Sequence, residues 1–267
     1  MGAYFRWGRQ GRGIIGNAGS AASGYTIIEV MLFFAVTGAL MLGVMGSASV
    51  GVNTQRYNDA VNTFSAILQQ EFTNVTNVTN TKSVQSMCGA GGETELQRGV
   101  SDCVIIGRLM TIDNQGNMMR SNLVGQDSGA ALDDGDTELE VVRSYNPKID
   151  ASSQETGNMS WETKILKGNP PEASYVSILL LRSPRSGNVY SYVSQSSTAV
   201  IANDTQLAAA ITNLVGEGSS PRNSRDQFLC VDRSGWVVTP MRAIKLAPFS
   251  SGPSGVSIID AEGNVCA

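Results

Sequence analysis

An apolar run without a single charged side chain, over residues 30–52, constrains this chain more than any other feature. At a rise of about 1.5 Å per residue, a helix of this length spans the hydrocarbon core of a lipid bilayer. The run contains Gly38, Gly43, Gly46 and Gly51. Such small residues let membrane helices approach one another closely, although they are also simply tolerated there. The sequence therefore predicts a transmembrane helix and leaves the purpose of its glycines open.

One carboxylate, Glu29, stands directly before this run. An ionised side chain inside a bilayer costs at least about 3 kcal/mol, so an acid at this place indicates a function and a partner of opposite charge. The alternative is that Glu29 extends to the lipid headgroups at the end of an ordinary membrane anchor. Only under that alternative would replacing Glu29 by alanine be harmless.

The residues before the run are basic, because positions 1–24 contain no acidic residue and three arginines, Arg6, Arg9 and Arg12. A short basic flank of this kind stays on the cytoplasmic side of the membrane. A secretory signal places its apolar core before the cleavage site, whereas here the apolar segment follows Gly24. We therefore expect a removable leader over residues 1–24 and a separate membrane helix over residues 25–52 that survives processing.

The sequence Gly24-Tyr25-Thr26-Ile27-Ile28-Glu29, between the basic leader and the apolar run, resembles the amino terminus of the type IV pilin and pseudopilin superfamily. In prepilins of this family a glycine precedes the cleavage site, an aromatic residue begins the mature protein and a glutamate is its fifth residue. The resemblance implies that a prepilin peptidase cuts between Gly24 and Tyr25, usually with methylation of the new amine. Tyr25 replaces the more common phenylalanine and keeps the aromatic ring. The similarity covers roughly the first fifth of the chain.

The resemblance also implies a role for Glu29 in assembly. In a filament core, the carboxylate of one subunit neutralises the amine that cleavage creates at Tyr25 of its neighbour. Either charge alone would carry a desolvation penalty of several kcal/mol, so the pair favours one register of packing. The implied partners are other pilin subunits, the prepilin peptidase, the pilus assembly platform and the inner membrane before assembly. The implied location is a single pass through a prokaryotic cytoplasmic membrane, followed by an extracellular filament.

Beyond the membrane segment, apolar residues recur at spacings of three and four: Tyr57, Val61, Phe64, Leu68, Phe72 and Val75. This stripe predicts an amphipathic helix over residues 53–80 that continues the membrane helix and packs against a sheet. The Asn/Thr-rich residues 74–81 predict its end, because their side chains compete for backbone hydrogen bonds.

Short segments rich in Val, Ile, Leu or Tyr predict strands at residues 103–112, 138–145, 174–182, 189–193, 228–231, 236–238 and 242–246. Residues 232–235 predict a hairpin turn, and residues 206–215 a short helix. The expected fold class is α+β, with a long amino-terminal α-helix packed on an antiparallel β-sheet, as the pilin resemblance also implies. Residues 81–267 are expected to form a β-rich extracytoplasmic head. Residues 113–136, 146–158 and 219–226 are expected to be surface loops.

The four cysteines, Cys88, Cys103, Cys230 and Cys266, all follow the membrane segment, where an exported domain meets an oxidising environment. Four cysteines allow three pairings, and the sequence does not decide between them. Proximity along the chain favours Cys88 with Cys103 and Cys230 with Cys266. Four structural thiols are the alternative, and the absence of Cys-x-x-Cys and of histidine disfavours a zinc site.

An enzymatic function finds little support. The chain has no histidine, which excludes Ser-His-Asp, Cys-His and histidine-ligated metal chemistry. The acidic cluster of Asp133, Asp134 and Asp136 offers oxygen ligands for calcium, but its spacing does not match an EF-hand loop, so a solvated acidic loop is the alternative. The sequence predicts no enzyme, no cofactor and no catalytic residue.

Acidic side chains outnumber basic ones by 23 to 19, which does not favour general nucleic-acid binding. Contact of an assembled filament with surfaces or with DNA remains an open expectation. The sequence favours a pilin subunit of a type IV pilus or related filament. One alternative is a minor pilin or type II secretion pseudopilin that primes a short filament. The other is a membrane-anchored extracytoplasmic binding domain that never polymerises.

Overall fold

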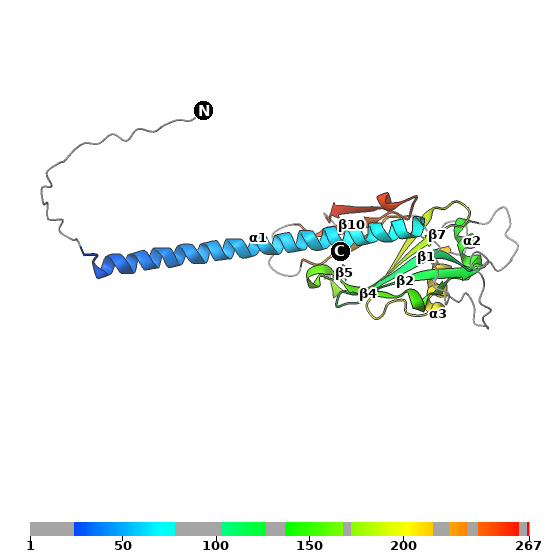
Figure 1. Ribbon diagram of the computed structural model, residues 1–267, viewed down its shortest axis with the longest axis horizontal. Coiled ribbons are helices and arrows are strands. Elements are labelled where there is room, and N and C mark those ends of the chain that lie inside the picture. Colours follow the sequence, from blue (N-terminus) through cyan, green and yellow to red (C-terminus); the bar gives the residue numbers. More distant parts are fainter. Residues whose placement is uncertain are drawn as a thin grey trace, which may run out of the picture. The chain divides into compact units, whose positions relative to one another are not determined.

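The computed structural model describes residues 24–77, 103–126, 137–167, 172–215, 225–233, 240–261 and 266. The chain divides into two units, Met1–Ser47 and Ala48–Ala267. Figure 1 labels helix α1 and several of the other helices and strands. The first unit contains the amino-terminal part of a long helix, and the second contains the rest of that helix together with all the strands.

Helix α1 runs without a break from Ile27 to Thr76. Its first turn is closed by Thr26, whose carbonyl and hydroxyl oxygens accept from the amide of Glu29 at 3.0 and 3.3 Å. By length and composition α1 can cross a membrane. Helix α1 includes both the apolar segment and the buried stripe from Tyr57 to Val75. The helix ends at Thr76, inside the polar stretch that predicts its end.

The larger sheet has seven strands, all paired antiparallel, in the order β11-β8-β7-β1-β2-β3, with β4 also pairing with β2. Its strands are β1 (Cys103–Ile112), β2 (Asn117–Gln126), β3 (Lys148–Ile149), β4 (Glu155–Asn158), β7 (Tyr175–Arg182), β8 (Val189–Ser196) and β11 (Phe249–Ser250).

The smaller sheet has five strands, also antiparallel, in the order β12-β10-β9-β5-β6. These strands are β5 (Ile165–Lys167), β6 (Glu172–Ala173), β9 (Gln227–Val231), β10 (Arg242–Leu246) and β12 (Val256–Asp260). The remaining helical elements are α2 (Glu138–Ser144), α3 (Asp204–Val215) and the short 3-10 turns η1 (Ala151–Ser153), η2 (Ser160–Glu162) and η3 (Pro253–Gly255).

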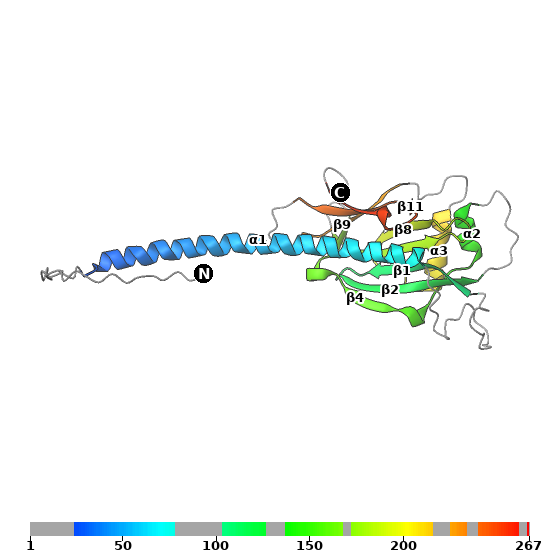
Figure 2. The ribbon, with the colours of Figure 1, turned by 45° about the horizontal axis from the view of Figure 1, so that its top comes forward.

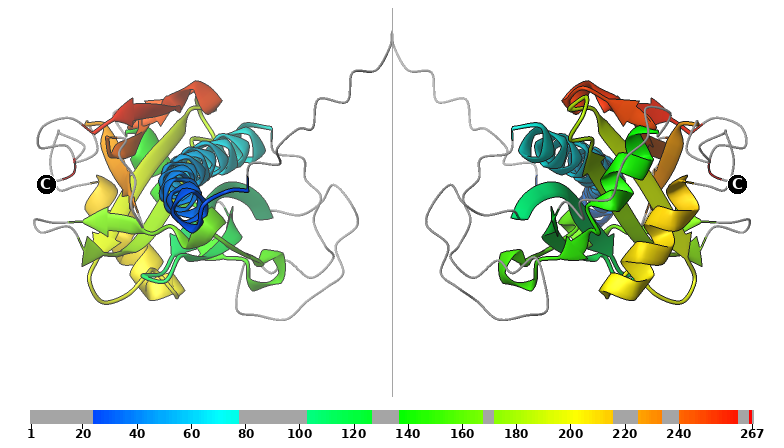
Figure 3. Two further views of the ribbon diagram at one scale, coloured as in Figure 1. Left: turned by 90° about the vertical axis from the view of Figure 1, so that its left-hand side faces the viewer. Right: turned by 90° about the vertical axis from the view of Figure 1, so that its right-hand side faces the viewer.

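The main core lies between α1 and both sheets, as Figure 2 shows. The apolar stripe of α1, from Tyr57 to Val75, packs there against residues of β1, β2, β5, β7, β8, β9, β10 and β12. A second core lies on the opposite face of the seven-stranded sheet, where α2 and α3 cover it (Figure 3). Strand β7 is apolar on both faces for this reason: Ile178 and Leu180 face α1, and Leu179 and Leu181 face the other helices. The fold is thus an α+β arrangement of a long apolar amino-terminal helix and antiparallel sheets.

Most predicted strands are present, two with unchanged boundaries and three with a boundary shifted by one to three residues, and the helix predicted at residues 206–215 is α3. The strand predicted at residues 138–145 is wrong, because this segment forms helix α2. Thr137 caps α2 in a capping box with Glu140, and Leu139 and Val142 face one core at helical spacing. The segment at residues 236–238 and residues 234–235 of the predicted hairpin turn lie outside the described residues.

The predicted surface loop at residues 113–136 is also wrong in its first half. Strand β2 occupies Asn117–Gln126, after a tight turn in which Asp113 accepts from the amides of Gln115 and Asn117 at 2.8 Å each. Its buried Met118 and Leu123 face different cores and are separated by Met119 and three polar residues, so the segment shows no regular alternation of apolar side chains. Residues 146–158, also predicted as a loop, contain β3, η1 and β4. Strands β5, β6, β11 and β12 match none of the predicted strands.

Candidate functional site

The amino-terminal segment of the described chain is fully accessible. An added Cβ on Gly24 would meet no atom within 4 Å, and Tyr25 is 82% exposed. Glu29 is exposed in the first turn of α1, where the positive end of the helix dipole favours a carboxylate. The peptide bond between Gly24 and Tyr25 therefore lies just before the helix, and the acid follows one turn after it.

The apolar residues of α1 that follow Glu29 are also exposed. Ile28, Leu32, Phe33 and Phe34 are each more than 60% exposed, and the exposed apolar series continues to Val52. A continuous apolar surface of this kind needs lipid or other apolar helices around it.

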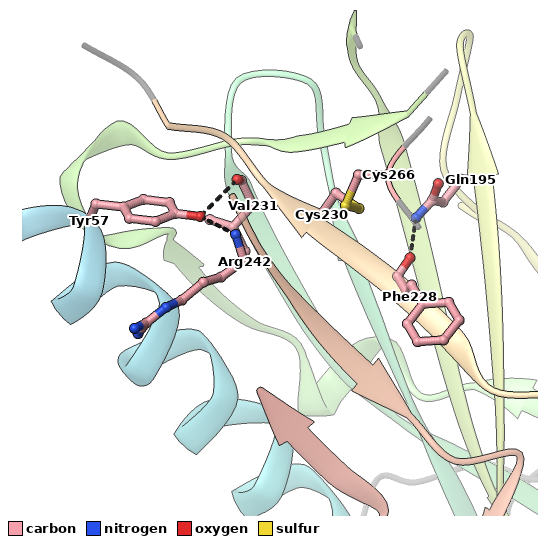
Figure 4. The surroundings of a disulfide bond; sticks show 7 residues. All are labelled: Tyr57, Gln195, Phe228, Cys230, Val231, Arg242 and Cys266. Carbon is pink, nitrogen blue, oxygen red and sulfur yellow. Dashed lines mark hydrogen bonds between the residues drawn. A yellow bond between two sulfur atoms is a disulfide. The ribbon is translucent and has the colours of Figure 1, made fainter. Parts of the chain in front are cut away.

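Burial begins at Tyr57, whose ring is in the core while its hydroxyl group bonds to two strands of the smaller sheet (Figure 4). The hydroxyl oxygen accepts from the amide of Arg242 at 2.6 Å and donates to the carbonyl of Val231 at 3.5 Å. Burial raises the pKa of Tyr57, so the hydroxyl keeps its proton. Tyr57 thus ties α1 to the adjacent ends of β9 and β10.

A cluster of four charged side chains ties the other end of the stripe to the larger sheet. Glu71 of α1, only 1% exposed, forms ion pairs with Arg108 of β1 and with Arg120 of β2, the latter at 3.2 Å. Glu155 of β4 then pairs with Arg120 at 3.1 Å and with Arg108 at 3.7 Å. We call these four residues the four-charge cluster. Two acids and two bases make it formally neutral.

In the four-charge cluster, burial and the neighbouring arginines act in opposite directions on the pKa of Glu71. Burial raises the pKa of Glu71, and the charges of Arg108 and Arg120 oppose that rise. Glu155 is 54% exposed and connects the cluster to solvent. The arrangement holds helix α1 on the larger sheet.

The structure joins Cys230 of β9 to Cys266 by a disulfide, with the two Cα atoms 5.8 Å apart (Figure 4). The bond packs on the outer face of the smaller sheet with Leu166 and Ala243. On the neighbouring strands the Gln195 side chain donates to the carbonyl of Phe228 at 3.3 Å, which links the two sheets. The expected pair of Cys88 and Cys103 falls outside the described residues, because residues 78–102 are not described.

An open cavity of about 790 Å³ lies beside α1, between the helix, the β1–β2 turn and η2. Asn53 and Arg56 of α1 and Trp161 of η2 line it, together with Lys164. The Arg56 guanidinium carbon lies 4.9 Å from the centre of the Trp161 ring, which is a cation–π contact.

Two consecutive residues at this contact have a left-handed backbone, Trp161 with φ +59° and Glu162 with φ +54°. This conformation is energetically costly for any residue other than glycine.

The calcium candidates Asp133, Asp134 and Asp136 lie outside the described residues. Within the described parts of the chain, no group of three His, Cys, Asp or Glu side chains is arranged to hold a metal ion. Glu138, next to that acidic segment, accepts from the hydroxyl groups of Ser183 and of Ser186, the latter at 2.8 Å. It therefore joins α2 to the turn between β7 and β8.

Comparison with protein-family models, with curated proteins and with solved structures gives no match.

Sequence reasoning did not find the four-charge cluster or the Arg56–Trp161 contact. A signal for the first exists, because Glu71 lies three residues after Leu68 and so falls on the apolar stripe of α1. An acid on a buried helix face requires a cationic partner. The second has no local signal, since only the tertiary fold brings η2 next to Arg56.

Proposed function

We propose that this chain is a structural subunit of the type IV pilin kind, processed at Gly24 and assembled into a filament through the amino-terminal part of α1. The observation that carries the proposal is the position of Glu29. This acid stands one turn after the proposed cut, at the start of a helix segment with exposed apolar side chains. A membrane can surround that surface first, and neighbouring helices can surround it later.

The two parts of α1 suit two tasks. From Tyr57 onward, the buried stripe and the four-charge cluster fix this part of the helix to the sheets of the head. Before Val52, exposed apolar residues are free to pack against other subunits. In that environment Glu29 and the freed amine of Tyr25 each need a partner, because an unpaired charge in an apolar bundle costs several kcal/mol.

Mass spectrometry of the native protein tests processing. We expect the mature chain to begin at Tyr25 with one added methyl group. A mature chain that still begins at Met1 would contradict the proposal and would favour the non-polymerising membrane anchor.

A charge-neutralising substitution tests assembly. Glu29→Gln should keep processing at Gly24 but lower the yield of sheared filaments at least tenfold, because an uncompensated buried amine costs several kcal/mol and about 1.4 kcal/mol already corresponds to a factor of ten. The matched control is Asp59→Asn, which removes an exposed acid of the same helix and should leave the yield unchanged. Equal yields from the two variants would refute the role of Glu29.

A minor pilin or secretion pseudopilin is the second candidate. It is favoured by the elaboration of the head, which carries a second sheet and the additional layer of α2 and α3. The abundance of the chain in sheared filaments distinguishes the candidates, since a main subunit dominates the filament mass and a priming subunit occurs in trace amounts.

A further inference from the structure

The Arg56–Trp161 contact lies close to the point at which the apolar surface of α1 ends. Val52 is the last exposed large apolar residue of α1, and Arg56 follows four residues later, a rise of about 6 Å. In sequence, Arg56 is also the first charged residue after Glu29. The headgroup layer on each side of a bilayer is about 5–8 Å thick. If the apolar surface ends at the hydrocarbon boundary, Arg56 lies in the headgroup layer.

Trp161 adds the side chain that this layer favours. Tryptophan is enriched at membrane interfaces, where its apolar ring and its N–H group meet lipid and water. Trp161 is 53% exposed although it is large and apolar, and it contacts Arg56, which places it at the same depth along the helix. Its left-handed backbone is maintained by the surrounding fold at a cost, which is typical of functional positions.

The cavity beside this contact has the chemistry of a phosphate site. Arg56 and Lys164 are its two cations and Glu162 its one acid, and the amide side chains of Asn53, Gln115, Asn117 and Asn158 add hydrogen-bond donors. Phosphodiester oxygens accept such bonds, and a surface lysine or arginine attracts an anionic lipid.

We propose that Arg56, Trp161 and Lys164 form a headgroup clamp, which binds the phosphate of an anionic phospholipid and sets the depth of the head on the membrane before assembly. The proposal rests on the membrane-spanning state of the proposed function and is independent of filament formation. The headgroup clamp must release its phospholipid when a subunit leaves the membrane for the filament.

Tryptophan fluorescence of the full chain in vesicles tests the clamp. Of the three tryptophans, Trp7 and Trp236 are replaced by phenylalanine, so that Trp161 is the only reporter. The vesicles contain phosphatidylcholine with bromine either near the headgroup or deep in the acyl chain. We expect Trp161 to be quenched by the shallow bromine and much less by the deep one. If the Trp161 emission is not quenched by bromine but its wavelength changes with protein concentration, the proposal is overturned. Trp161 would then contact a second copy of the chain instead of lipid.

Lipid selectivity tests the two cations. Quenching by brominated phosphatidylglycerol relative to brominated phosphatidylcholine gives the preference of the site for anionic lipid. Arg56→Gln and Lys164→Gln should each lower that preference about fivefold. The control Lys148→Gln removes a cation that does not line the cavity and should leave the preference unchanged. Equal preferences in all variants would overturn the phosphate site.

A reporter in the apolar helix separates the two possible failures. In a chain without Trp7, Trp161 and Trp236, the indole introduced by Phe34→Trp should be quenched by the deep bromine if α1 is inserted. If this helix reporter is quenched while Trp161 in its own single-tryptophan chain is not, the clamp alone is overturned. Lack of quenching in both chains overturns the clamp together with the membrane-spanning state.

Discussion

Glu71 is the one charged side chain on the buried face of α1, a helix that the structure describes over its whole length. Its ion pairs with Arg108 and Arg120 offset only part of its desolvation, since burial still leaves the pKa of Glu71 raised. Removing one charge from such a cluster leaves the remaining charges buried without a partner, and this lowers the free energy of unfolding strongly.

We therefore expect Glu71→Gln to lower the free energy of unfolding by about 3 kcal/mol, because it leaves two largely buried arginines with only Glu155. The comparison is Glu155→Gln, at the solvent-exposed end of the four-charge cluster, for which the loss should be below about 1 kcal/mol. Urea unfolding of the full chain in detergent micelles measures both. Similar losses from the two variants would contradict the importance of burial.

The ionisation of Glu138 should make the stability of the fold depend on pH. The hydroxyl group of Ser183, more than that of Ser186, holds the pKa of Glu138 below its ordinary value of 4.5. A carboxyl with a lowered pKa in the folded state contributes stability above its ordinary value, and this contribution is lost as the pH falls through the lowered pKa. Stability should therefore decrease with acidification below pH 4.5.

In Ser183→Ala, the pKa of Glu138 should rise toward its ordinary value, since the stronger of the two hydroxyl donors is gone. Ser186→Ala should raise it less. NMR titration of the Glu138 side-chain carboxyl carbon reads the pKa directly, without dependence on overall stability. An unchanged pKa in Ser183→Ala would show that another group holds it low.

At the scale of elements, the spacing of apolar residues predicts a helix or a strand correctly where one face of a long element is apolar. Helix α1 follows from its stripe, and β7 follows from an unbroken apolar run that two helix layers cover. The same spacing does not predict short elements such as α2 correctly. The β-branched Val141 and Val142 favour a strand, yet the capping box of Thr137 and Glu140 makes the segment a helix.

The candidate site shows the same division. Gly24, Tyr25 and Glu29 stay predicted site residues, and they are proposed because they belong to one short segment of the sequence. The four-charge cluster and the Arg56–Trp161 contact join residues that are distant in sequence, so strand register and turn geometry decide them. In β1, for instance, the register shifts between Ile105 and Gly107, and residues after that bulge, including Arg108, follow the shifted register.

Gly107 is predicted to be sensitive to substitution, because an added Cβ would overlap the backbone carbonyl of Leu180 on the neighbouring strand β7. Gly107→Ala should cost about 1–3 kcal/mol through displacement of β1 from β7. Gly157→Ala on β4 is the control, since its Cβ would make only an ordinary 3.6 Å contact with the end of Met118. Thermal unfolding followed by circular dichroism compares the two. A tolerated Gly107→Ala would mean that the strands separate at little cost.

At the scale of the head, α1 is attached at two polar points, Tyr57 to the smaller sheet and Glu71 to the larger one, with the apolar stripe between them. The two sheets therefore share one helix as their common support. The disulfide between Cys230 and Cys266 lies on the outer face of the smaller sheet, away from that helix, and closes a loop with a sequence separation of 36.

Removal of this disulfide should consequently destabilise the head without displacing α1. For a loop of this length the chain-entropy model gives a loss of about 3–4 kcal/mol in the free energy of unfolding for the paired change Cys230→Ala and Cys266→Ala. Urea unfolding of the full chain in detergent measures the loss. Hydrogen exchange should show faster opening of β9 and β10 and unchanged protection from Phe64 to Phe72 of α1, because the core between α1 and the larger sheet is kept. If protection of α1 falls as far as that of β9, the two sheets unfold as one cooperative unit and the helix depends on both.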